Sequence, residues 1–385
     1  MNSVSSPSRL AVLTTVHRWG DPRVFERNAC AAVQCGLEVH AFVPVTGDPP
    51  LPQWGRQGEF HLHNLPMSQG RLGRMWLALR VGKYVSKDGE FDAIHFHDPE
   101  LIPAMIWLSL RHPRVRILYD VHEELPLEVF SKSYIPRPLR PLASGFARLL
   151  WSMAARRFHA FAPATEAIAA HWPPERTRVV HNYPRSMFNR PRNGLEVNPN
   201  RIAFVGALTQ IHGVEEVLQS VSRLRQEYPQ VRLELYGRVL DASLKPAVDR
   251  SVREGWGQHI PWLEPAELVT RLSGAGVGLV PYRPLPDHLN ALPTKIFEYM
   301  ALGIPILASD FPLWRRIIQE QNVGLCSPPT VEGITQGLRL MLSDPARLQA
   351  WSVRAQETYQ QRYRWEVEAE NLRSLYRIMG LKVDP

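Results

Sequence analysis

Short apolar runs alternate with longer amphipathic stretches along almost the whole chain. Apolar runs of roughly four to eight residues are typical of strands buried in a parallel sheet, whereas apolar residues spaced three and four apart are typical of helices. The runs predict strands at residues 10–15, 37–43, 60–65, 91–96, 115–119, 159–162, 178–181, 201–206, 231–237, 277–282 and 305–309. The amphipathic stretches predict helices that include residues 21–34, 99–110, 213–228, 345–362 and 366–378.

The alternation of strands and helices predicts an α/β fold with parallel sheets. A Pro- and Asn-rich stretch at residues 182–200 interrupts the series once, after which it starts again. We therefore expect two doubly wound, Rossmann-like domains that face a central cleft, with a C-terminal helix crossing back to the N-terminal domain. The predicted bounds are 1–183 for the N-terminal domain, 184–200 for the linker, 201–362 for the C-terminal domain and 363–385 for the C-terminal helix. Ligands of such sheets bind at the carboxyl ends of the strands.

The composition narrows the class of protein only slightly. The chain has 385 residues, 44% of them hydrophobic, with a formal charge of +8, which fits nucleic acid, anionic lipid or a phosphorylated ligand. The three cysteines form no metal-binding pattern and are expected to be reduced. The first residues lack the apolar core of a signal peptide, and no apolar run approaches the ~20 residues of a spanning helix. We expect a cytoplasmic protein, or one peripheral to the inner face of the plasma membrane.

The stretch from Asn290 to Asp310 is the most informative part of the chain. Pro293 suits the first turn of a helix, where free N–H groups and the helix dipole favour an anion. Lys295 and Glu298 lie three residues apart and share one face of that helix. A cation for phosphate beside a carboxylate for hydroxyls suits a ligand such as a nucleotide-sugar.

Five segments, in their order along the chain, resemble motifs of the retaining glycosyltransferases of family 4, which have the GT-B fold. These segments are HRWGDPRVFER (17–27), IHFHDPELIP (94–103), YDVHEELP (119–126), FVGALTQIHG (204–213) and NALPTKIFEYMALGIPILAS (290–309). The resemblance covers essentially the whole length. It implies that the N-terminal domain binds the acceptor and that the C-terminal domain binds a nucleotide-sugar donor.

In that family the last of these motifs usually has two glutamates separated by seven residues. The second falls on Glu298, which the resemblance assigns to the ribose hydroxyls of the nucleotide. The first falls on Asn290, which can hydrogen-bond sugar hydroxyls but carries no charge. Ordinary solvated helix residues are the alternative for Glu298 and Lys295.

The chain departs from the family at two cationic positions. The family commonly has an arginine after the glycine of the first donor-domain strand and a lysine before the next glycine, where this chain has Ala207 and His212. A histidine with an ordinary pKa near ~6.5 is mostly neutral at pH 7. Lys295, its helix N-terminus and Arg18 or Arg23 would then neutralise the donor diphosphate, so we expect weaker activity or an unusual donor.

His122 matches a family histidine that lies near the donor sugar and the reacting anomeric carbon. Because a retaining transfer mainly needs positioning and charge stabilisation, the resemblance makes His122 a hydrogen-bond donor to the sugar rather than a general base. A satisfied core histidine is the alternative. Glu123 and Glu124 are either acceptor contacts or loop charges.

The histidines and carboxylates of residues 95–100 have the spacing of metal ligands. No cysteine or distant histidine cluster completes a site in the sequence, and the residues flanking His95 and His97 are apolar. We therefore favour an acceptor-side or loop-structuring role for His97 and Asp98, and expect no metal requirement.

The first-loop segment predicts a helix with Asp21 as its cap and Pro22 in its first turn. We expect Gly20 and Asp21 to present backbone N–H groups toward the cleft. An ordinary capped helix explains Asp21 and Pro22 but not the flanking Arg18 and Arg23. The predicted donor contacts are Gly20, Asp21, Gly206, His212, Asn290, Pro293, Thr294, Lys295 and Glu298, and the predicted catalytic residues are His122, Lys295 and Glu298. No cofactor beyond the donor substrate is expected.

Two basic segments lie in the N-terminal half, at residues 71–87 and 129–165. The second carries arginines and aromatic residues and no acid between Lys132 and Ala164. Such segments suit an anionic membrane surface, although their aromatic residues could equally pack into the core. Nucleic acid is disfavoured because no known nucleic-acid module is present.

The predicted function is retaining transfer of a sugar from a nucleotide-diphosphate sugar to a glycan or lipid-linked acceptor in cell-surface polysaccharide synthesis. One alternative is a sugar-nucleotide epimerase on the same fold, for which Asp98, Glu123 and Glu124 are the only candidate acid–base carboxylates. The other is a non-catalytic partner that keeps the fold, which Ala207, His212 and Asn290 favour.

Overall fold

The computed structural model describes residues 7–47, 49, 51, 54–55, 59–68, 70–85, 90–131, 135–185 and 196–384. The chain divides into two compact units. Unit 1 comprises Met1–Asn182 and Trp365–Pro385, and unit 2 comprises Tyr183–Arg364. Residues 186–195 of the predicted linker lie outside the described residues.

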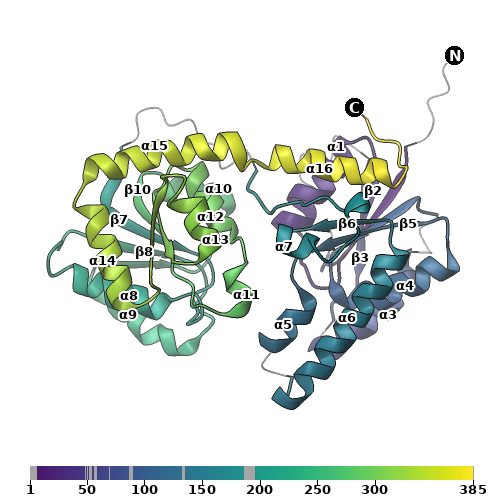
Figure 1. The fold of residues 1–385 in the computed structure, drawn as a ribbon, viewed down its shortest axis with the longest axis horizontal. Coiled ribbons are helices and arrows are strands. Elements are labelled where there is room, and N and C mark those ends of the chain that lie inside the picture. The colour runs from purple at the N-terminus through teal and green to yellow at the C-terminus, as the bar shows by residue number, and fades with distance from the viewer. Residues whose placement is uncertain are drawn as a thin grey trace. The chain divides into compact units, whose positions relative to one another are not determined.

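Unit 1 contains a six-stranded sheet in the order β3-β2-β1-β4-β5-β6 (Figure 1). All of its strand pairs are parallel. Its strands are β1 (Arg9–Leu13), β2 (Glu38–Pro44), β3 (Phe60–Leu65), β4 (Ala93–Phe96), β5 (Arg116–Val121) and β6 (Ala160–Pro163). The central strands are buried on both faces, which explains their nearly continuous apolar sequences.

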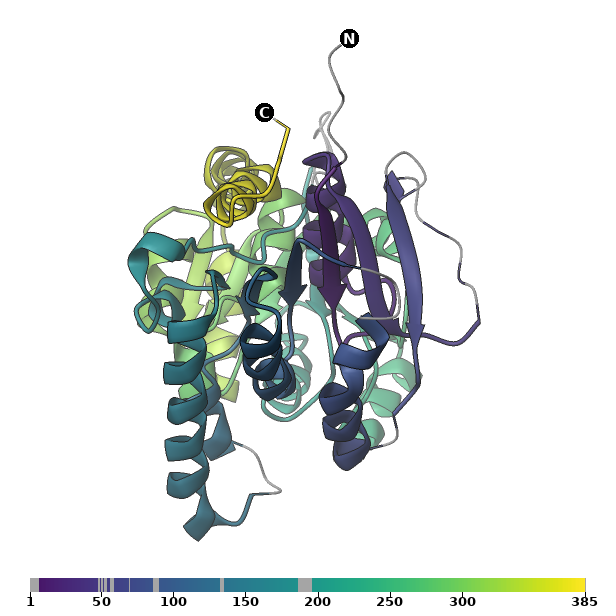
Figure 2. The same ribbon diagram turned by 90° about the vertical axis from the view of Figure 1, so that its right-hand side faces the viewer.

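Helices cover both faces of this sheet (Figures 1 and 2). Leu77, Met105 and Trp151 join one apolar cluster, which places α3 (Gly70–Val85), α4 (Ile102–Arg111) and α6 (Arg140–Arg157) on one face. Val24 and Leu372 join the other cluster, which places η1 (Pro22–Ala29), α1 (Cys30–Gln34) and α16 (Trp365–Ile378) on the opposite face. The C-terminal helix therefore packs on unit 1, as the sequence predicts.

Unit 2 repeats the same topology, with a parallel six-stranded sheet in the order β12-β11-β10-β7-β8-β9. Its strands are β7 (Asn198–Val205), β8 (Arg232–Tyr236), β9 (Gly257–Ile260), β10 (Ala275–Val280), β11 (Ile306–Ser309) and β12 (Gly324–Ser327). One face carries α10 (Pro265–Leu272), α12 (Thr294–Ala301) and α13 (Pro312–Ile318), and the other carries α8 (Val214–Leu224), α9 (Lys245–Arg253) and α14 (Val331–Leu342). The helix α15 (Pro345–Arg362) contributes to both clusters.

The predicted α/β class with two doubly wound sheets is confirmed. The strand predicted at residues 178–181 is wrong, because this segment follows β6 through the bonds Arg178 N–H to Phe161 O and Val180 N–H to Pro163 O without forming a strand. Strands β9 and β12 were not predicted, since their sequences contain few consecutive apolar residues. Among the described residues, no helix combines the length and apolar character needed to cross a membrane.

Candidate functional site

Each sheet reverses its winding between its two central strands. In unit 2 these strands are β7 and β10, and in unit 1 they are β1 and β4. Doubly wound sheets bind ligands just outside the carboxyl ends of the strands at this reversal. The loops after these four strands are therefore the candidate ligand-binding loops of the two units.

In unit 2 the loop after β7 comes very close to neighbouring backbone. Gly213, which precedes α8, has φ +72°, and a Cβ there would lie 2.0 Å from the carbonyl oxygen of Pro281. Gly206 has φ +115°, and a Cβ there would lie 2.9 Å from Lys295 Nζ. The left-handed conformation and the close approach together require glycine at both positions. The loop thus packs between the end of β10 and the first turn of α12.

Lys295 is the most unusual side chain of this loop region. It is 7% exposed, and its Nζ atom has no hydrogen-bond partner among the described residues. Nζ lies 4.5 Å from the ring centroid of Phe204 and 5.0 Å from that of Tyr282. Burial lowers the pKa of Lys295 to about 7, although the charge of Glu298 opposes the change. A buried amine without a hydrogen-bond acceptor is suited to an anionic ligand.

The helix α12 begins one residue later than predicted. Pro293 is its N-cap, with ψ 128°, and Thr294 is the first helical residue. The reason is that Pro293 already has the extended conformation of the preceding loop and has no N–H to contribute. Ile296 N–H bonds back to Pro293 O, whereas the first N–H groups of a helix have no intrahelical acceptor. The N–H groups of Thr294 and Lys295 therefore begin the helix beside the buried amine. The helix ends before Gly303, at φ +65°, as predicted.

His212 is held in one tautomer beside Lys295. Its Nδ1 donates a hydrogen bond of 2.9 Å to Ala207 O, which leaves Nε2 as an acceptor. Its ring stacks on Tyr282 at 4.4 Å between centroids. Burial lowers the pKa of His212, and the nearby positive charge of Lys295 lowers it further. His212 is thus a neutral imidazole at pH 7, and Lys295 of α12, with a pKa of about 7, is the group beside it that carries a positive charge at lower pH.

Glu298 and Asn290 have different surroundings. Glu298 lies on α12 one turn after Lys295 and is partly buried. Asn290 is exposed and ends the short helix α11 (Pro286–Leu289). The structure therefore brings Gly206, His212, Lys295 and Glu298 together. Asn290 lies at the exposed start of the loop that connects α11 to α12.

In unit 1 the reversal between β1 and β4 is organised by Asp98. Its carboxylate accepts hydrogen bonds from Thr14 Oγ1 at 3.0 Å and from the N–H groups of Thr15 and Val16. The side chain is 2% exposed. Asp98 therefore structures the loop after β1, which is one of the two roles, acceptor-side or loop-structuring, predicted from the sequence.

A second carboxylate, Asp120, is buried at the end of β5. Arg23 donates two hydrogen bonds to this carboxylate, from Nε at 3.0 Å and from a terminal nitrogen at 2.5 Å, and the Asn28 side-chain amide donates a third at 2.6 Å. His97 Nδ1 lies 2.9 Å and His122 Nε2 lies 3.1 Å from the same oxygen. Burial alone would raise the pKa of Asp120, but the charge of Arg23 and these hydrogen bonds hold it well below its usual value. Asp120 orients His122, whose side chain remains 22% exposed.

The loop before η1 adds His17 and Asp21 to this group. His17 Nδ1 lies 2.8 Å from Asp21 Oδ2, and the His17 ring lies 5.4 Å from the His122 ring. Burial lowers the pKa of His17, but the hydrogen bond and charge of Asp21 raise it above the ordinary value. Asp21 caps η1 through the N–H groups of Arg23 and Val24, as predicted.

The prediction that Gly20 and Asp21 present their N–H groups toward the cleft is wrong for Asp21. This N–H donates a 3.0 Å hydrogen bond to Arg18 O, because Gly20 at φ +84° closes a tight turn. The Asp21 N–H group therefore already has its hydrogen-bond acceptor within the loop. The π-helix η1 (Pro22–Ala29) follows and directs Arg23 to Asp120.

The acid beside the histidine pair His95 and His97 is Asp120 rather than Asp98. Ligand atoms of His95, His97 and Asp120 lie within 4.8 Å of one another. Both Asp120 oxygens are already bound by the buried Arg23, and burial lowers the pKa of both histidines. The group has the composition of a buried ion-pair network, in which a fixed guanidinium already supplies the positive charge.

The sequence analysis assigned no role to Asp120 or Tyr282. An acid inside the buried part of the strand Arg116–Val121, after Ile117, Leu118 and Tyr119, is a signal that could have identified Asp120, because a buried charge needs a partner. Tyr282 gave no such signal, since its contacts with His212 and Lys295 come from packing alone.

Comparison with known proteins identifies the family and the fold of this chain. Residues 186–358 match the family described as "Glycosyl transferases group 1", and residues 20–183 match the "Glycosyl transferase 4-like domain". The chain belongs to the GT-B glycosyltransferases of the family 4-like type.

Individual relatives are distant. A glycogen synthase of Mycobacterium tuberculosis is 27% identical over 194 residues, which cover 49% of this chain and 44% of that protein, less than half of its length. A phosphatidyl-myo-inositol mannosyltransferase of Mycolicibacterium smegmatis is 25% identical over 319 residues, covering 79% of this chain and 76% of that protein. The structure of Anabaena HepE in complex with UDP and glucose has a TM-score of 0.68 at 15% identity and covers 96% of this chain and 99% of that one. At this identity the likeness concerns the fold alone.

Proposed function

We propose that the chain is a retaining glycosyltransferase that uses a nucleotide-diphosphate sugar as donor and a glycan or lipid-linked molecule as acceptor. Synthesis of a cell-surface polysaccharide is the process we assign to it. The observation that carries the proposal is the buried Lys295 amine, which has no hydrogen-bond partner among the described residues and lies at the start of α12. A diphosphate would supply the acceptors that this amine and the first N–H groups of α12 need.

Neighbouring groups in unit 2 are assigned to the ribose and sugar parts of the donor. Glu298 lies one turn further along α12 and provides a carboxylate for the ribose hydroxyls. His212 Nε2 offers an acceptor for a sugar or ribose hydroxyl, because its Nδ1 is committed to Ala207 O. The relatives are consistent with such a donor, since HepE is seen with UDP and glucose.

His122 of unit 1 is the group we assign to the transferred sugar. Its Nε2 lies 3.1 Å from Asp120 and donates its proton to that carboxylate, so we assign the other ring nitrogen of this 22% exposed side chain to a hydroxyl of the sugar. With no general base required, the leaving diphosphate oxygen takes the proton of the acceptor hydroxyl as the new glycosidic bond forms on the same face. Asp120, held by Arg23, keeps the imidazole in place.

The test is donor binding and turnover across a panel of nucleotide sugars. We expect at least one donor to raise the unfolding temperature and to be hydrolysed slowly without acceptor. Glu298→Ala should weaken binding of that donor about tenfold or more, whereas Glu320→Ala, at an exposed position of the same unit, should not. The proposal fails if no donor binds and none is turned over.

A non-catalytic partner protein is the second candidate, and the neutral His212 beside Ala207 favours it. This arrangement leaves fewer cations for the leaving diphosphate than the family usually has. If the protein is catalytic but weak, the double variant Ala207→Arg/His212→Lys should turn over donor faster than the natural chain. If the protein is non-catalytic, the double variant should bind donor and still not turn it over.

We also assign α6 to an anionic membrane surface. Leu142, Phe146, Leu149 and Met153 lie on one stripe of the helix and are 72%, 60%, 56% and 39% exposed, whereas Trp151 and Phe158 are buried in the core. Arginines flank the stripe, and the helix Arg140–Arg157 contains no acidic residue. Of the residues invoked from the sequence, Lys87, Lys132 and Tyr134 and the side chains of Arg71 and Lys83 lie outside the described part of the chain.

Vesicle co-sedimentation tests this surface. The protein should bind vesicles rich in phosphatidylglycerol and release them in high salt, and should not bind phosphatidylcholine alone. Phe146→Ser/Leu149→Ser should reduce binding, and Leu340→Ser, at a position of unit 2 that is 64% exposed, is the control. Equal binding by both variants would exclude α6 as the contact.

A further inference from the structure

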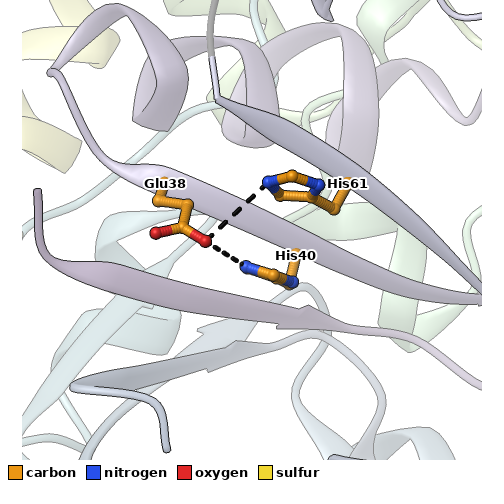
Figure 3. A group of neighbouring side chains, drawn as sticks. All are labelled: Glu38, His40 and His61. Carbon is orange, nitrogen blue, oxygen red and sulfur yellow. Dashed lines mark hydrogen bonds and ion pairs between the residues drawn. The ribbon is translucent and has the colours of Figure 1, made fainter. Parts of the chain in front are cut away.

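A second polar cluster lies in unit 1 at the amino ends of β2 and β3. This end of the sheet is opposite to the carboxyl ends of the strands, where Asp98 and Asp120 lie. Glu38 and His40 point to the same face of β2, and His61 extends from the neighbouring edge strand β3 (Figure 3). His40 and His61 are paired in the parallel register of the two strands, so their side chains stand next to each other. No motif in the sequence indicates a role for these residues.

The three side chains converge on one oxygen atom. His40 Nε2 lies 2.7 Å and His61 Nε2 lies 3.8 Å from Oε1 of Glu38 (Figure 3). Ligand atoms of all three lie within 4.8 Å of one another. Nitrogens and oxygens bound to one zinc ion at about 2.0–2.2 Å lie roughly 3.3 Å apart, so only small side-chain shifts separate this arrangement from a coordination set.

The surroundings fix the orientation of His40. Its Nδ1 lies 2.9 Å from His63 Nε2, and its ring packs edge-on against Phe91 at 5.1 Å and stacks on His61 at 4.5 Å. His63 in turn stacks on Phe42 at 4.5 Å. Metal-binding histidines usually have the second ring nitrogen hydrogen-bonded in this way, which directs the first nitrogen at the ion.

His40 Nε2 faces two groups with opposite requirements. Glu38 Oε1 at 2.7 Å requires a proton or another cation on this nitrogen, whereas the Arg9 guanidinium at 3.1 Å requires a lone pair. A neutral imidazole serves only one of them. Arg9 Nε also donates a 3.2 Å hydrogen bond to Glu38 Oε1, so the arginine now supplies the positive charge of the cluster. A metal cation bound to Nε2 and Oε1 would replace Arg9 at both atoms, and Arg9, which is 30% exposed, would keep its bond to Glu90 O.

We propose that Glu38, His40 and His61 bind a divalent first-row transition ion such as Zn²⁺, with solvent completing the coordination. Two histidines and one carboxylate form a set that zinc takes in proteins. The exposed Glu59, whose carboxylate lies 3.9 Å from His61 Nε2, is the candidate for a further ligand. Because the site joins the edge strand β3 to β2, the ion acts as a cross-link of the sheet and not in sugar transfer.

The group of His95, His97 and Asp120 is a poorer candidate for the same ion. There Arg23 binds both carboxylate oxygens, and its side chain is 6% exposed, so it has no route to solvent. At the Glu38 cluster the competing Arg9 is 30% exposed and bonds to Oε1 of the carboxylate, and His61 is 46% exposed, which gives an ion a path of entry.

Metal titration of the full-length protein, purified without a histidine tag and stripped with a chelator, tests the proposal. We expect one Co²⁺ or Zn²⁺ ion per chain with micromolar or tighter affinity, seen by calorimetry and by the absorption bands of tetrahedral Co²⁺. His61→Ala and Glu38→Gln should each weaken binding at least tenfold. His61 and Glu38 are partly exposed, so neither variant should prevent folding, and circular dichroism checks this.

Two matched variants separate this site from the alternatives. His112→Ala removes an exposed histidine of the same unit and should bind metal like the natural chain. His97→Ala removes a member of the other group and should also leave binding intact. The proposal is overturned if the natural chain binds neither ion in the micromolar range, if His61→Ala binds as tightly as the natural chain, or if only His97→Ala loses the ion.

Discussion

A Cβ atom at position 206 would lie 2.9 Å from Nζ of Lys295, so the lysine amine occupies the space that a side chain would need at Gly206. The two residues come from different segments, the end of β7 and the first turn of α12. Their contact places a buried cation at the carboxyl end of the central strands of unit 2. It is the contact on which the proposed donor site depends.

Gly206→Ala should weaken donor binding by about tenfold or more, because the new methyl group displaces the Lys295 amine. Calorimetric titration of a bound nucleotide sugar measures the effect. The matched control is Gly255→Ala, which also has a positive φ, +73°, but has nothing within 4 Å of the added Cβ. The control should lose some stability and keep its affinity for the donor. Equal affinities of the two variants would show that the Lys295 contact has no role.

Donor affinity should fall as the pH rises through about 7. Burial lowers the pKa of Lys295 to about 7, so the free protein has the charged amine below this pH and the neutral amine above it. A ligand that needs the cation must then take up a proton on binding, which costs up to about tenfold in affinity per pH unit above the pKa. Titrations between pH 6 and 9 should use an intact nucleotide sugar, because the terminal phosphate of a free nucleotide itself titrates near pH 6.

Two variants check that Lys295 is the titrating group. Lys295→Met should bind weakly at every pH and lose the dependence. Lys295→Arg has a charge that does not titrate in this range, so its affinity should vary little with pH even if it is lower overall. A pH profile of Lys295→Met that parallels the natural chain would assign the dependence to another group.

The alternation of apolar runs was sufficient to predict both sheets, because central strands such as β1 and β10 are buried on both faces. Lys295 could be found from its motif, since the local order Pro293, Lys295, Glu298 and Gly303 is itself the helix start and stop. The Asp120 network could not, because Arg23 and Asp120 are 97 residues apart and meet only when β1 and β5 join one sheet. The Glu38 cluster was missed for the same reason: His40 and His61 become neighbours through strand register alone.

Asp120→Asn should destabilise unit 1 by about 3–5 kcal/mol, because it leaves the buried Arg23 guanidinium without its counter-charge. The double variant Arg23→Met/Asp120→Asn should recover part of this loss, since it removes the unpaired charge. Urea denaturation at pH 7 measures both. Asp249→Asn, which breaks an exposed ion pair with Lys245, is the control and should change stability by less than about 1 kcal/mol. A loss for Asp120→Asn no greater than that of the control would contradict a tight buried pair.

The contribution of His181 to the stability of unit 1 should fall as the pH rises. Its Nδ1 lies 3.1 Å from Glu368 on α16, and its Nε2 lies 3.1 Å from Glu166. Burial lowers the pKa of His181, but hydrogen bonds and charges of the two glutamates raise it to about 9. A raised pKa in the folded state means that the stabilisation is fully present below the unfolded value near 6.5 and is lost as the pH rises through about 9. The difference between these values corresponds to on the order of 3 kcal/mol.

The free energy of unfolding, measured from pH 6 to 10 for the natural chain and for His181→Gln, isolates this contribution. The natural chain should lose its advantage over the variant progressively between pH 6.5 and 9, and other titrating groups cancel in the difference. His171→Gln is the matched control, because His171 also pairs with a glutamate, Glu124 at 3.0 Å, but is 45% exposed and screened by solvent. The stability difference between His171→Gln and the natural chain should be small. If the difference in unfolding free energy from the natural chain does not vary with pH for His181→Gln, the contact between residue 181 and Glu368 of α16 does not depend on a charged imidazole.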